Sequence, residues 1–197
     1  QCSTTSMSSS MVCRDVQSSV TEVSQLFLMP TTSLQISNPK GMNHMSEYIE
    51  QTTNFLSDGG EILQFEIDDA VYGIEIQYIT EIIQIQQITI VPKVPSYIKG
   101  MMNLRGKVIP VMSVRSRFGK EEIPYDDRTC IIVVEWDGLA VGLIVDRIRE
   151  VAMISPEEVS STPDYKNVNM NHFIKYIIET GDEIKLLLDC ETLVTER

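Results

Sequence analysis

Residues 100–111 read Gly-Met-Met-Asn-Leu-Arg-Gly-Lys-Val-Ile-Pro-Val, and they are the most informative stretch of the chain. Apolar segments flank a polar centre, Asn-Leu-Arg-Gly at 103–106, as in two strands joined by a turn. Gly100 and Gly106 bracket this centre, and glycine tolerates the positive φ values of tight turns. The amide and the guanidinium between them need hydrogen-bond partners wherever they are buried. These residues alone allow two interpretations, a simple turn between strands or a binding surface.

The segments on both sides predict a mainly β fold. Residues 63–68 alternate between apolar and polar side chains, the period of a half-buried strand. Residues 130–136 are almost continuously apolar and β-branched, which indicates a strand buried on both faces. Turn residues at 68–69, 137–138 and 181–182 separate such segments. The predicted hairpins join 63–68 to 71–76, 130–136 to 139–145, and 173–179 to 184–188.

The expected helices are short, over 78–83, 114–118 and 190–193. In the first, Tyr78, Ile79, Ile82 and Ile83 share one helical face. Ser113 and Asp189 are candidate N-caps of the second and third, and Gly119 is a C-terminal stop of the second.

Pro110 lies in a strand-like segment and cannot donate a ladder hydrogen bond. We therefore expect its strand to lie at a sheet edge or to be bulged there.

The chain also shows an internal repeat, with the offset in sequence that carries Gly73 onto Gly142. Under this offset Ile67-Asp68-Asp69 falls on Trp136-Asp137-Gly138, and Gly73-Ile74 falls on Gly142-Leu143. The following Ile-x-Glu-apolar pattern at 79–82 falls on 148–151. The repeat is consistent with two similar β subdomains, or with chance similarity between two hairpins.

Composition excludes several classes of function. The formal net charge is −12, and residues 61–197 alone carry 14 basic and 23 acidic residues, or −9. This charge argues against binding to nucleic acid, and against an anionic membrane surface. Apolar segments are too short to cross a bilayer. We expect no membrane insertion.

No catalytic or metal-binding pattern stands out in the sequence. Phosphate loops, nucleophile elbows and calcium loops are not found, and the two histidines are His44 and His172. The cysteines do not form close pairs, and Cys130 and Cys190 lie in apolar, strand-like segments, which favours buried, reduced thiols. We therefore expect neither an enzyme, nor a metal site, nor a cofactor.

Two parts of unequal character divide the chain. Residues 1–58 are rich in Ser and Thr at the start and lack a sustained apolar period, so we expect them to be disordered or weakly ordered. Translation could begin at Met45, which would make residues 1–44 an extension. Residues 61–197 form the predicted folded domain.

The ordered motifs of residues 61–193 resemble the CheW family of chemotaxis coupling proteins. The motifs that carry the resemblance are Tyr72-Gly73-Ile74, Ile79-Thr80-Glu81-Ile82, Thr89-Ile90-Val91-Pro92, Pro95 to Gly100, Asn103-Leu104-Arg105-Gly106, Val108-Ile109-Pro110-Val111, Gly142 to Asp146, and Leu187-Leu188-Asp189. A lone Asn-Leu-Arg-Gly motif is weak evidence, but the same motif within this ordered set is specific.

The resemblance implies a fold and a role. The fold would be two five-stranded β-barrel subdomains around a shared core, with short helices. The role would be a non-enzymatic cytoplasmic adaptor that joins the regulatory domain of the histidine kinase CheA to the cytoplasmic tips of chemoreceptors. The receptor groove would involve five residues, Ile79, Ile82, Asn103, Leu104 and Val108. Glu81 and Arg105 would form a partly buried salt bridge that supports it, next to the motif glycines Gly100 and Gly106.

Two departures from the family pattern concern local structure. Ser113 stands where the family commonly has Asp, and Lys175-Tyr176 stands near a common Gly. The alternatives are an adaptor of a kinase pathway outside chemotaxis and the CheW-like part of a CheV-type protein. The second alternative would need a receiver domain after residue 197, so a stand-alone coupling protein is favoured.

Overall fold

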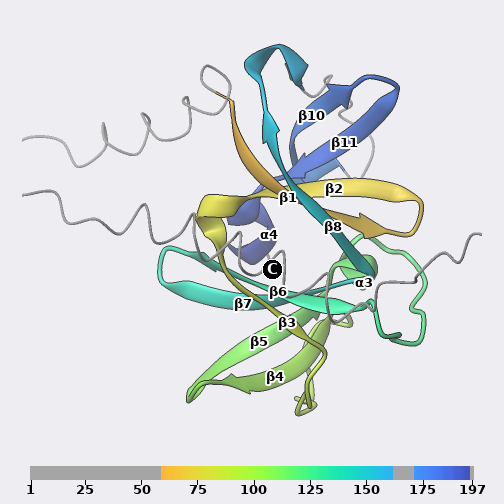
Figure 1. Cartoon of the computed structure of the whole chain (residues 1–197). Coiled ribbons are helices and arrows are strands. Elements are labelled where there is room, and N and C mark those ends of the chain that lie inside the picture. The colour runs from red at the N-terminus through yellow and green to blue at the C-terminus, as the bar shows by residue number, and fades with distance from the viewer. Residues whose placement is uncertain (1–58, 162–170, 196–197) are drawn as a thin grey trace, which may run out of the picture.

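Two β-sheets, one above the other, form the body of the protein in the computed structural model (Figure 1), which describes residues 59–161 and 171–195. Sheet A has the strand order β8 (Arg147–Ile154), β1 (Gly60–Ile67), β2 (Ala70–Glu75), β11 (Glu183–Leu188), β10 (Ile174–Thr180), β9 (Val159–Ser161). Sheet B has the order β3 (Ile79–Gln84), β6 (Cys130–Trp136), β7 (Leu139–Val145), β5 (Lys107–Ser113), β4 (Ile98–Leu104). The short helices are η1 (Ile76–Tyr78), α3 (Val114–Arg117), η2 (Pro156–Glu158), η3 (Asn171–Phe173) and α4 (Cys190–Thr195).

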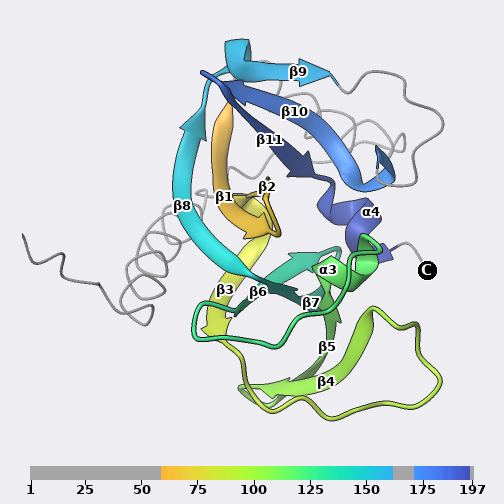
Figure 2. The ribbon, with the colours of Figure 1, turned by 90° about the vertical axis from the view of Figure 1, so that its right-hand side faces the viewer.

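The internal repeat is real, because strand register obeys it. Gln64 pairs with Gly73 in the β1–β2 hairpin, and their equivalents, Val133 and Gly142, pair in the β6–β7 hairpin. The strands that follow exchange places. After η1, β3 joins sheet B beside β6, whereas β8 leaves sheet B and joins sheet A beside β1 (Figure 2). Each sheet is therefore completed by a strand from the other half of the repeat.

A second offset, which carries Val111 onto Leu187, relates the remaining hairpins. Leu187 of β11 lies beside Gly73, and Val111 of β5 lies beside Gly142, in parallel pairs. The β4–β5 hairpin with α3 in sheet B thus corresponds to the β10–β11 hairpin with α4 in sheet A. Together the two offsets define an equivalent position in one sheet for most positions in the other.

The prediction of two five-stranded barrels needs correction, since the sheets are open and contain five and six strands. In each sheet, the segment that follows one edge strand, β3 or β8, continues to the opposite side of the same sheet. After β3, Thr89 forms an isolated bridge with Met101 of β4, and after β8, β9 pairs with β10. The curl of each sheet approaches a barrel without a closed hydrogen-bond ladder.

The core has three parts. The largest lies between the sheets and includes Phe65, Tyr72, Ile79, Ile82 and Leu143. Each sheet also has one smaller cluster of its own, which fills its inner curl. The cluster of sheet B contains Met102, Ile109, Val111, Ile131, Val133 and Ile144, and that of sheet A contains Ile62, Ile154, Ile178 and Leu187. One face of most strands therefore serves the shared core, while the other serves the inner cluster of its own sheet.

The predicted helix over 78–83 is wrong, because the segment forms β3 after the single 3-10 turn of η1. Its apolar spacing of three results from a bulge between Ile79 and Glu81 in the pairing with β6. The bulge places Ile79 and Ile82 on one face of a strand. Their β-branched side chains also favour a strand.

The cap predictions are confirmed. The Ser113 hydroxyl accepts the backbone N–H of Ser116 at the start of α3, and the Asp189 carboxylate accepts that of Glu191 in α4. Ser113 thus serves as an N-cap, a position that favours Ser and Asp alike. Cys190 begins this helix, so its predicted place in a strand was wrong.

The prediction for Pro110 is correct only in part. Strand β5 is not at an edge, since it lies between β4 and β7. Pro110 pairs with Met101 of β4, whereas the ladder to β7 starts one residue later, at Val111. A proline fits there because the side of the strand that lacks an N–H donor faces no partner strand.

Sheet A buries polar groups at positions where sheet B is apolar. Gln64 is buried and its Nε2 has no hydrogen-bond partner, while the equivalent residue of sheet B is Val133 in an apolar cluster. An unpaired buried amide costs about 1–3 kcal/mol. We expect Gln64→Val to raise the free energy of unfolding by about 1 kcal/mol in urea denaturation. Val133→Gln is the matched reverse change and should lower it by at least as much; a loss of stability in Gln64→Val would contradict this account.

Candidate functional site

The Asn-Leu-Arg-Gly motif forms the tip of the β4–β5 hairpin. Arg105 and Gly106 are the two turn residues, with φ of 49° and 92°, as in a type I′ turn. A positive φ strains a residue with a Cβ. The Asn103 side chain offsets this strain, since its Oδ1 accepts the backbone N–H of Gly106 at 2.8 Å. Asn103 therefore shapes the turn that presents Arg105.

β3 and β4 are the two edge strands of sheet B, and the gap between them is the open seam of this sheet. Arg105, at the tip of the β4–β5 hairpin, reaches across this seam to Glu81 on β3. Its Nη2 donates to Glu81 Oε2 at 2.6 Å, so the predicted salt bridge is present. It differs from the expected partly buried pair, because the Arg105 side chain is 83% exposed and only that of Glu81 is shielded, at 13%. An ion pair with one exposed member contributes little to stability. The Arg105 guanidinium remains accessible to a partner.

Gly100 is required by a close backbone approach. Its φ is 145°, and a Cβ there would lie 2.1 Å from the carbonyl oxygen of Thr89. Thr89 and Met101 exchange two backbone hydrogen bonds at this point, of 2.8 and 2.9 Å. The equivalent position of sheet A is Tyr176, which pairs with Ser161 of β9 beside a bulge like that at Gly100. Tyr176 does not share the positive φ of Gly100, which explains why this position does not need glycine.

The structure separates the five predicted groove residues. Ile79 and Ile82 are buried in the shared core, so they support the surface from below and cannot contact a partner. Asn103 is exposed at the hairpin tip, and Leu104 is half-buried against the inner cluster of sheet B. Val108 is 68% exposed. It lies on the same face of β5 as Met112, which belongs to the shared core.

Sequence reasoning missed the residues that continue this face. Leu139, the first residue of β7, is exposed and lies on the same strand face as Val141 and Leu143 of the shared core. Tyr78 and Trp136 pack edge to face, with ring centroids 5.1 Å apart, against the same core. The sequence signal that could have identified Leu139 is its position as an apolar residue directly after the hairpin turn at 137–138. We call Val108, Leu139, Tyr78 and Trp136 the apolar rim.

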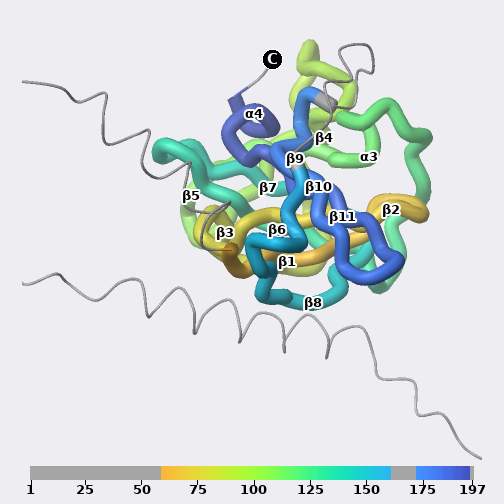
Figure 3. Tube along the Cα trace, turned by 90° about the horizontal axis from the view of Figure 1, so that it is seen from above, coloured from red at the N-terminus to blue at the C-terminus, as the bar shows by residue number. Residues whose placement is uncertain are grey.

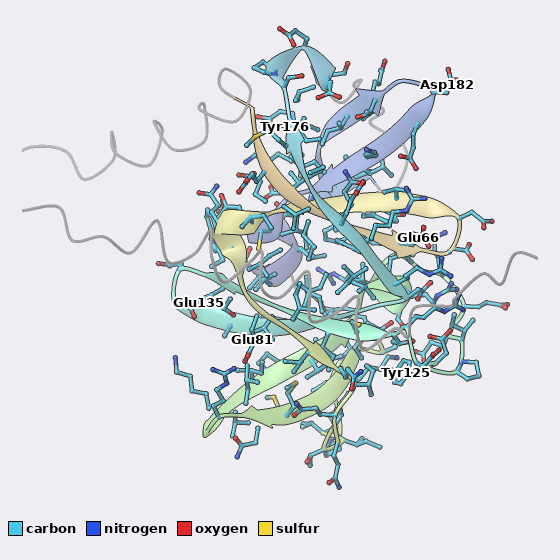
Figure 4. The ribbon with its side chains drawn as sticks, in the orientation of Figure 1. Glu66, Glu81, Tyr125, Glu135, Tyr176 and Asp182 are labelled. Atoms are coloured by element: carbon cyan, nitrogen blue, oxygen red, sulfur yellow. The ribbon has the colours of Figure 1, made fainter. Side chains whose placement is uncertain are left out.

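A second carboxylate lies near the seam of sheet B. Figure 4 shows Glu81 and Glu135 near one another on the adjacent strands β3 and β6. Glu81 pairs with Val133, and Glu135 follows two residues later on the same strand face. Glu135 is exposed. Glu81 and Glu135 thus lie on the strand face that carries the inner cluster of sheet B, opposite to the face of the rim. Arg105 and Glu135 are nevertheless close in sequence to rim residues, at the tips of the β4–β5 and β6–β7 hairpins.

The described residues do not contain a cluster of three or more His, Cys, Asp or Glu side chains placed to bind a metal. Cys130 and Cys190 are both buried, and burial raises the pKa of the Cys190 thiol to about 12. Three carboxylates of the connections, those of Glu122, Asp126 and Glu158, have structural partners. A hydrogen bond from the Arg128 side chain, for example, lowers the pKa of Asp126 to about 2. In the described part of the chain, helices are too short or too polar to span a membrane.

These features define a class of protein, a two-sheet β fold around a shared core. Residues 61–197 match the family model described as a CheW-like domain. The chemotaxis protein CheW of Helicobacter pylori is 34% identical over 140 residues, which cover 70% of this chain and 84% of that protein. CheW of Klebsiella aerogenes is 29% identical over 137 residues, covering 70% and 82%. The scaffolding protein TtCheW from Thermoanaerobacter tengcongensis has a similar structure, with a TM-score of 0.64 and 31% identity over 68% of this chain and 91% of that one. The chain belongs to the CheW family, and its role is that of a chemotaxis adaptor.

Proposed function

We propose that this protein joins a chemoreceptor tip to the regulatory domain of the histidine kinase CheA, in the cytoplasm and without catalysis of its own. The observation that carries the proposal is the apolar rim at the open edge of the shared core, next to the exposed Arg105. An exposed apolar surface bordered by polar groups is typical of a protein interface. The matched relatives are named as chemotaxis proteins and, in one case, a scaffold.

The receptor is assigned to the apolar rim and the hairpin tip. Val108 is the second residue of β5 and Leu139 the first of the neighbouring strand β7, so both apolar side chains can meet one partner surface. Arg105 and Glu135 place charges of opposite sign at the hairpin tips that also carry Val108 and Leu139. Ile79 and Ile82 belong to the packed floor beneath. The kinase is expected to contact the two sheets elsewhere, through a regulatory domain of the same fold.

The test is a pull-down with the regulatory domain of the host's CheA, in the absence and presence of a receptor-tip fragment. Binding to both partners supports the proposal. Binding to neither by a folded sample would withdraw the partner assignment, while the CheW-like fold would stand. Binding to the kinase domain alone would withdraw the receptor surface only.

Arg105→Ala is expected to weaken binding of the receptor-tip fragment by about tenfold, because it removes a charge-assisted contact. The far-UV spectrum and the melting temperature should stay close to those of the wild type, since the side chain is mostly exposed. Lys107→Ala is the control, an exposed cation at the next strand position. A loss of β structure in Arg105→Ala would show that Arg105 is mainly structural.

A further inference from the structure

Two connections carry the chain from one sheet to the other, and the repeat makes them equivalent. One runs from β2 to β3 through η1 and contains Gln77; the other runs from β7 to β8 through Asp146, which occupies the place of Gln77 in the second copy. In Figure 1 the first lies on the left of the molecule, and the second on the right beside α3. Their hydrogen bonding differs.

An ion network built around Arg115 of α3 holds the connection at Asp146. Its Nε and Nη2 donate to the two carboxylate oxygens of Asp146 at 3.2 and 2.8 Å, and Nη2 also donates to Asp68 at 3.3 Å. The backbone N–H of Asp68 donates to Asp146 at 2.8 Å. Asp68 is the tip of the β1–β2 hairpin in sheet A, whereas α3 follows β5 of sheet B. The network therefore joins the two sheets.

Aromatic contacts of α3 reach the same sheet. The Phe118 ring lies 5.2 Å from that of Tyr72 on β2 and 5.8 Å from that of Phe173 in η3. The Arg117 guanidinium stacks on Phe173 at 4.7 Å and on Tyr97 at 4.1 Å. This short helix and its cap thus contact sheet A or its flanking segments at three separate points.

The equivalent helix α4 makes a different kind of contact. Glu191 occupies the place of Arg115 and is exposed, and Gln77 donates to Glu75 of its own sheet. Cys190 and Leu193 join α4 to the shared core by apolar packing. Apolar contact has no preferred direction and allows small shear movements, whereas hydrogen bonds weaken when their angle changes.

We propose that the α3 side is the fixed joint between the sheets, that the η1 side is the compliant one, and that the Arg115–Asp68 contact sets the angle. Within the network, the Asp146 half is the permanent part, because the Arg115 side chain is only 10% exposed and binds both oxygens. Asp68 is 52% exposed, accepts from Arg115 at the longer distance of 3.3 Å, and also accepts from Lys120 at 3.1 Å. The apolar rim includes Tyr78 of η1. If the proposed function holds, a receptor bound there would adjust the sheets about α3.

The test compares Asp68→Asn with Asp137→Asn by native-state amide hydrogen exchange of the full chain. The two aspartates are equivalent in the repeat, at φ of 62° and 48°, and Asn tolerates this conformation well. Asp68→Asn weakens the contact with Arg115, so we expect amides of the β1–β8 ladder near Glu66 and Arg147 to exchange about fivefold faster. Amides of η1 and β3 should not change, and Asp137→Asn should affect only its own turn. An unchanged β1–β8 ladder in Asp68→Asn, or equal acceleration at both connections, would overturn the proposal.

A second arm adds the receptor-tip fragment. In the wild type, changes in exchange should appear at η1 and β3 and spare the β7–β8 connection; in Asp68→Asn they should reach both. Changes of equal size at both connections in the wild type would overturn the fixed joint. Failure of the wild type to bind the fragment would count against the proposed function only, because the first arm needs no partner.

Discussion

Lys175→Met is expected to lower the free energy of unfolding by about 3 kcal/mol, the largest stability effect that we predict. The Nζ of Lys175 on β10 donates to Glu75 Oε1 at 2.9 Å, where the Glu75 side chain is buried and that of Lys175 is largely shielded. Methionine keeps most of the volume of lysine but leaves the Glu75 carboxylate with the neutral amide of Gln77 as a donor, at 2.6 Å. A buried charge that loses its counter-ion is costly. Urea denaturation, with the melting temperature as a second readout, measures the loss.

Two further variants separate the pair from its surroundings. The double variant Lys175→Met/Glu75→Gln should recover more than half of the lost stability, since no uncompensated charge remains. Lys99→Met is the matched control at the equivalent position of sheet B, where lysine pairs with the exposed Glu122. It should cost less than about 1 kcal/mol. Equal losses in Lys175→Met and Lys99→Met would show that burial of the pair is unimportant.

Much of the fold could be predicted because its signals are local. The turn residues at 68–69, 137–138 and 181–182 all connect hairpins, and the strands 130–136 and 139–145 have the predicted limits. The internal repeat was visible because equivalent strands need the same alternation and the same glycine. Gly73 and Gly142 both face an isoleucine side chain where a Cβ would lie within 3 Å, so the spacing constrains both positions alike.

Features that depend on distant partners could not be predicted. The spacing at 78–83 fits a helix until β6 is known to lie beside it, because a bulge gives the same apolar interval. Lys175 and Glu75 are 100 residues apart, and Arg115 and Asp68 are 47 apart. The residue types indicate charge, but only the pairing of β11 with both β2 and β10 brings Lys175 near Glu75, and only the packing of the two sheets brings Arg115 near Asp68.

The candidate site was predicted in the right region with an incorrect division of roles. Ile79 and Ile82 matched a family motif, and a motif does not reveal that the shared core covers both side chains. The salt bridge of Glu81 with Arg105 was predicted correctly, whereas its exposure depends on the hairpin tip that carries Arg105 beyond the sheet. Leu139 was missed because its exposure, at the start of a strand with buried apolar residues, depends on where the second sheet ends.

Val108→Asp is expected to weaken binding of the receptor-tip fragment by about 100-fold, the largest effect on function that we predict. The side chain is mostly exposed in the free protein, so the fold should tolerate the carboxylate. In a complex through the apolar rim, the same carboxylate would be desolvated without a partner. Leu139→Asp should act in the same way, since Leu139 lies on the neighbouring strand. Titration with the labelled fragment gives the affinity, and the far-UV spectrum checks the fold.

Ile184→Asp is the matched control, because the offset that carries Val111 onto Leu187 also carries Val108 onto Ile184 in the other sheet. Ile184 is 62% exposed, and its β10–β11 hairpin, marked by Asp182 in Figure 4, lies far from the tip of β4–β5 in the view from above as well (Figure 3). Both variants add one carboxylate to an exposed apolar position near a hairpin tip. If binding depends on the rim, Val108→Asp loses affinity and Ile184→Asp retains it. Equal losses would indicate a general effect of negative charge on a protein of net charge −12, and retained affinity in Val108→Asp would remove the rim from the receptor surface.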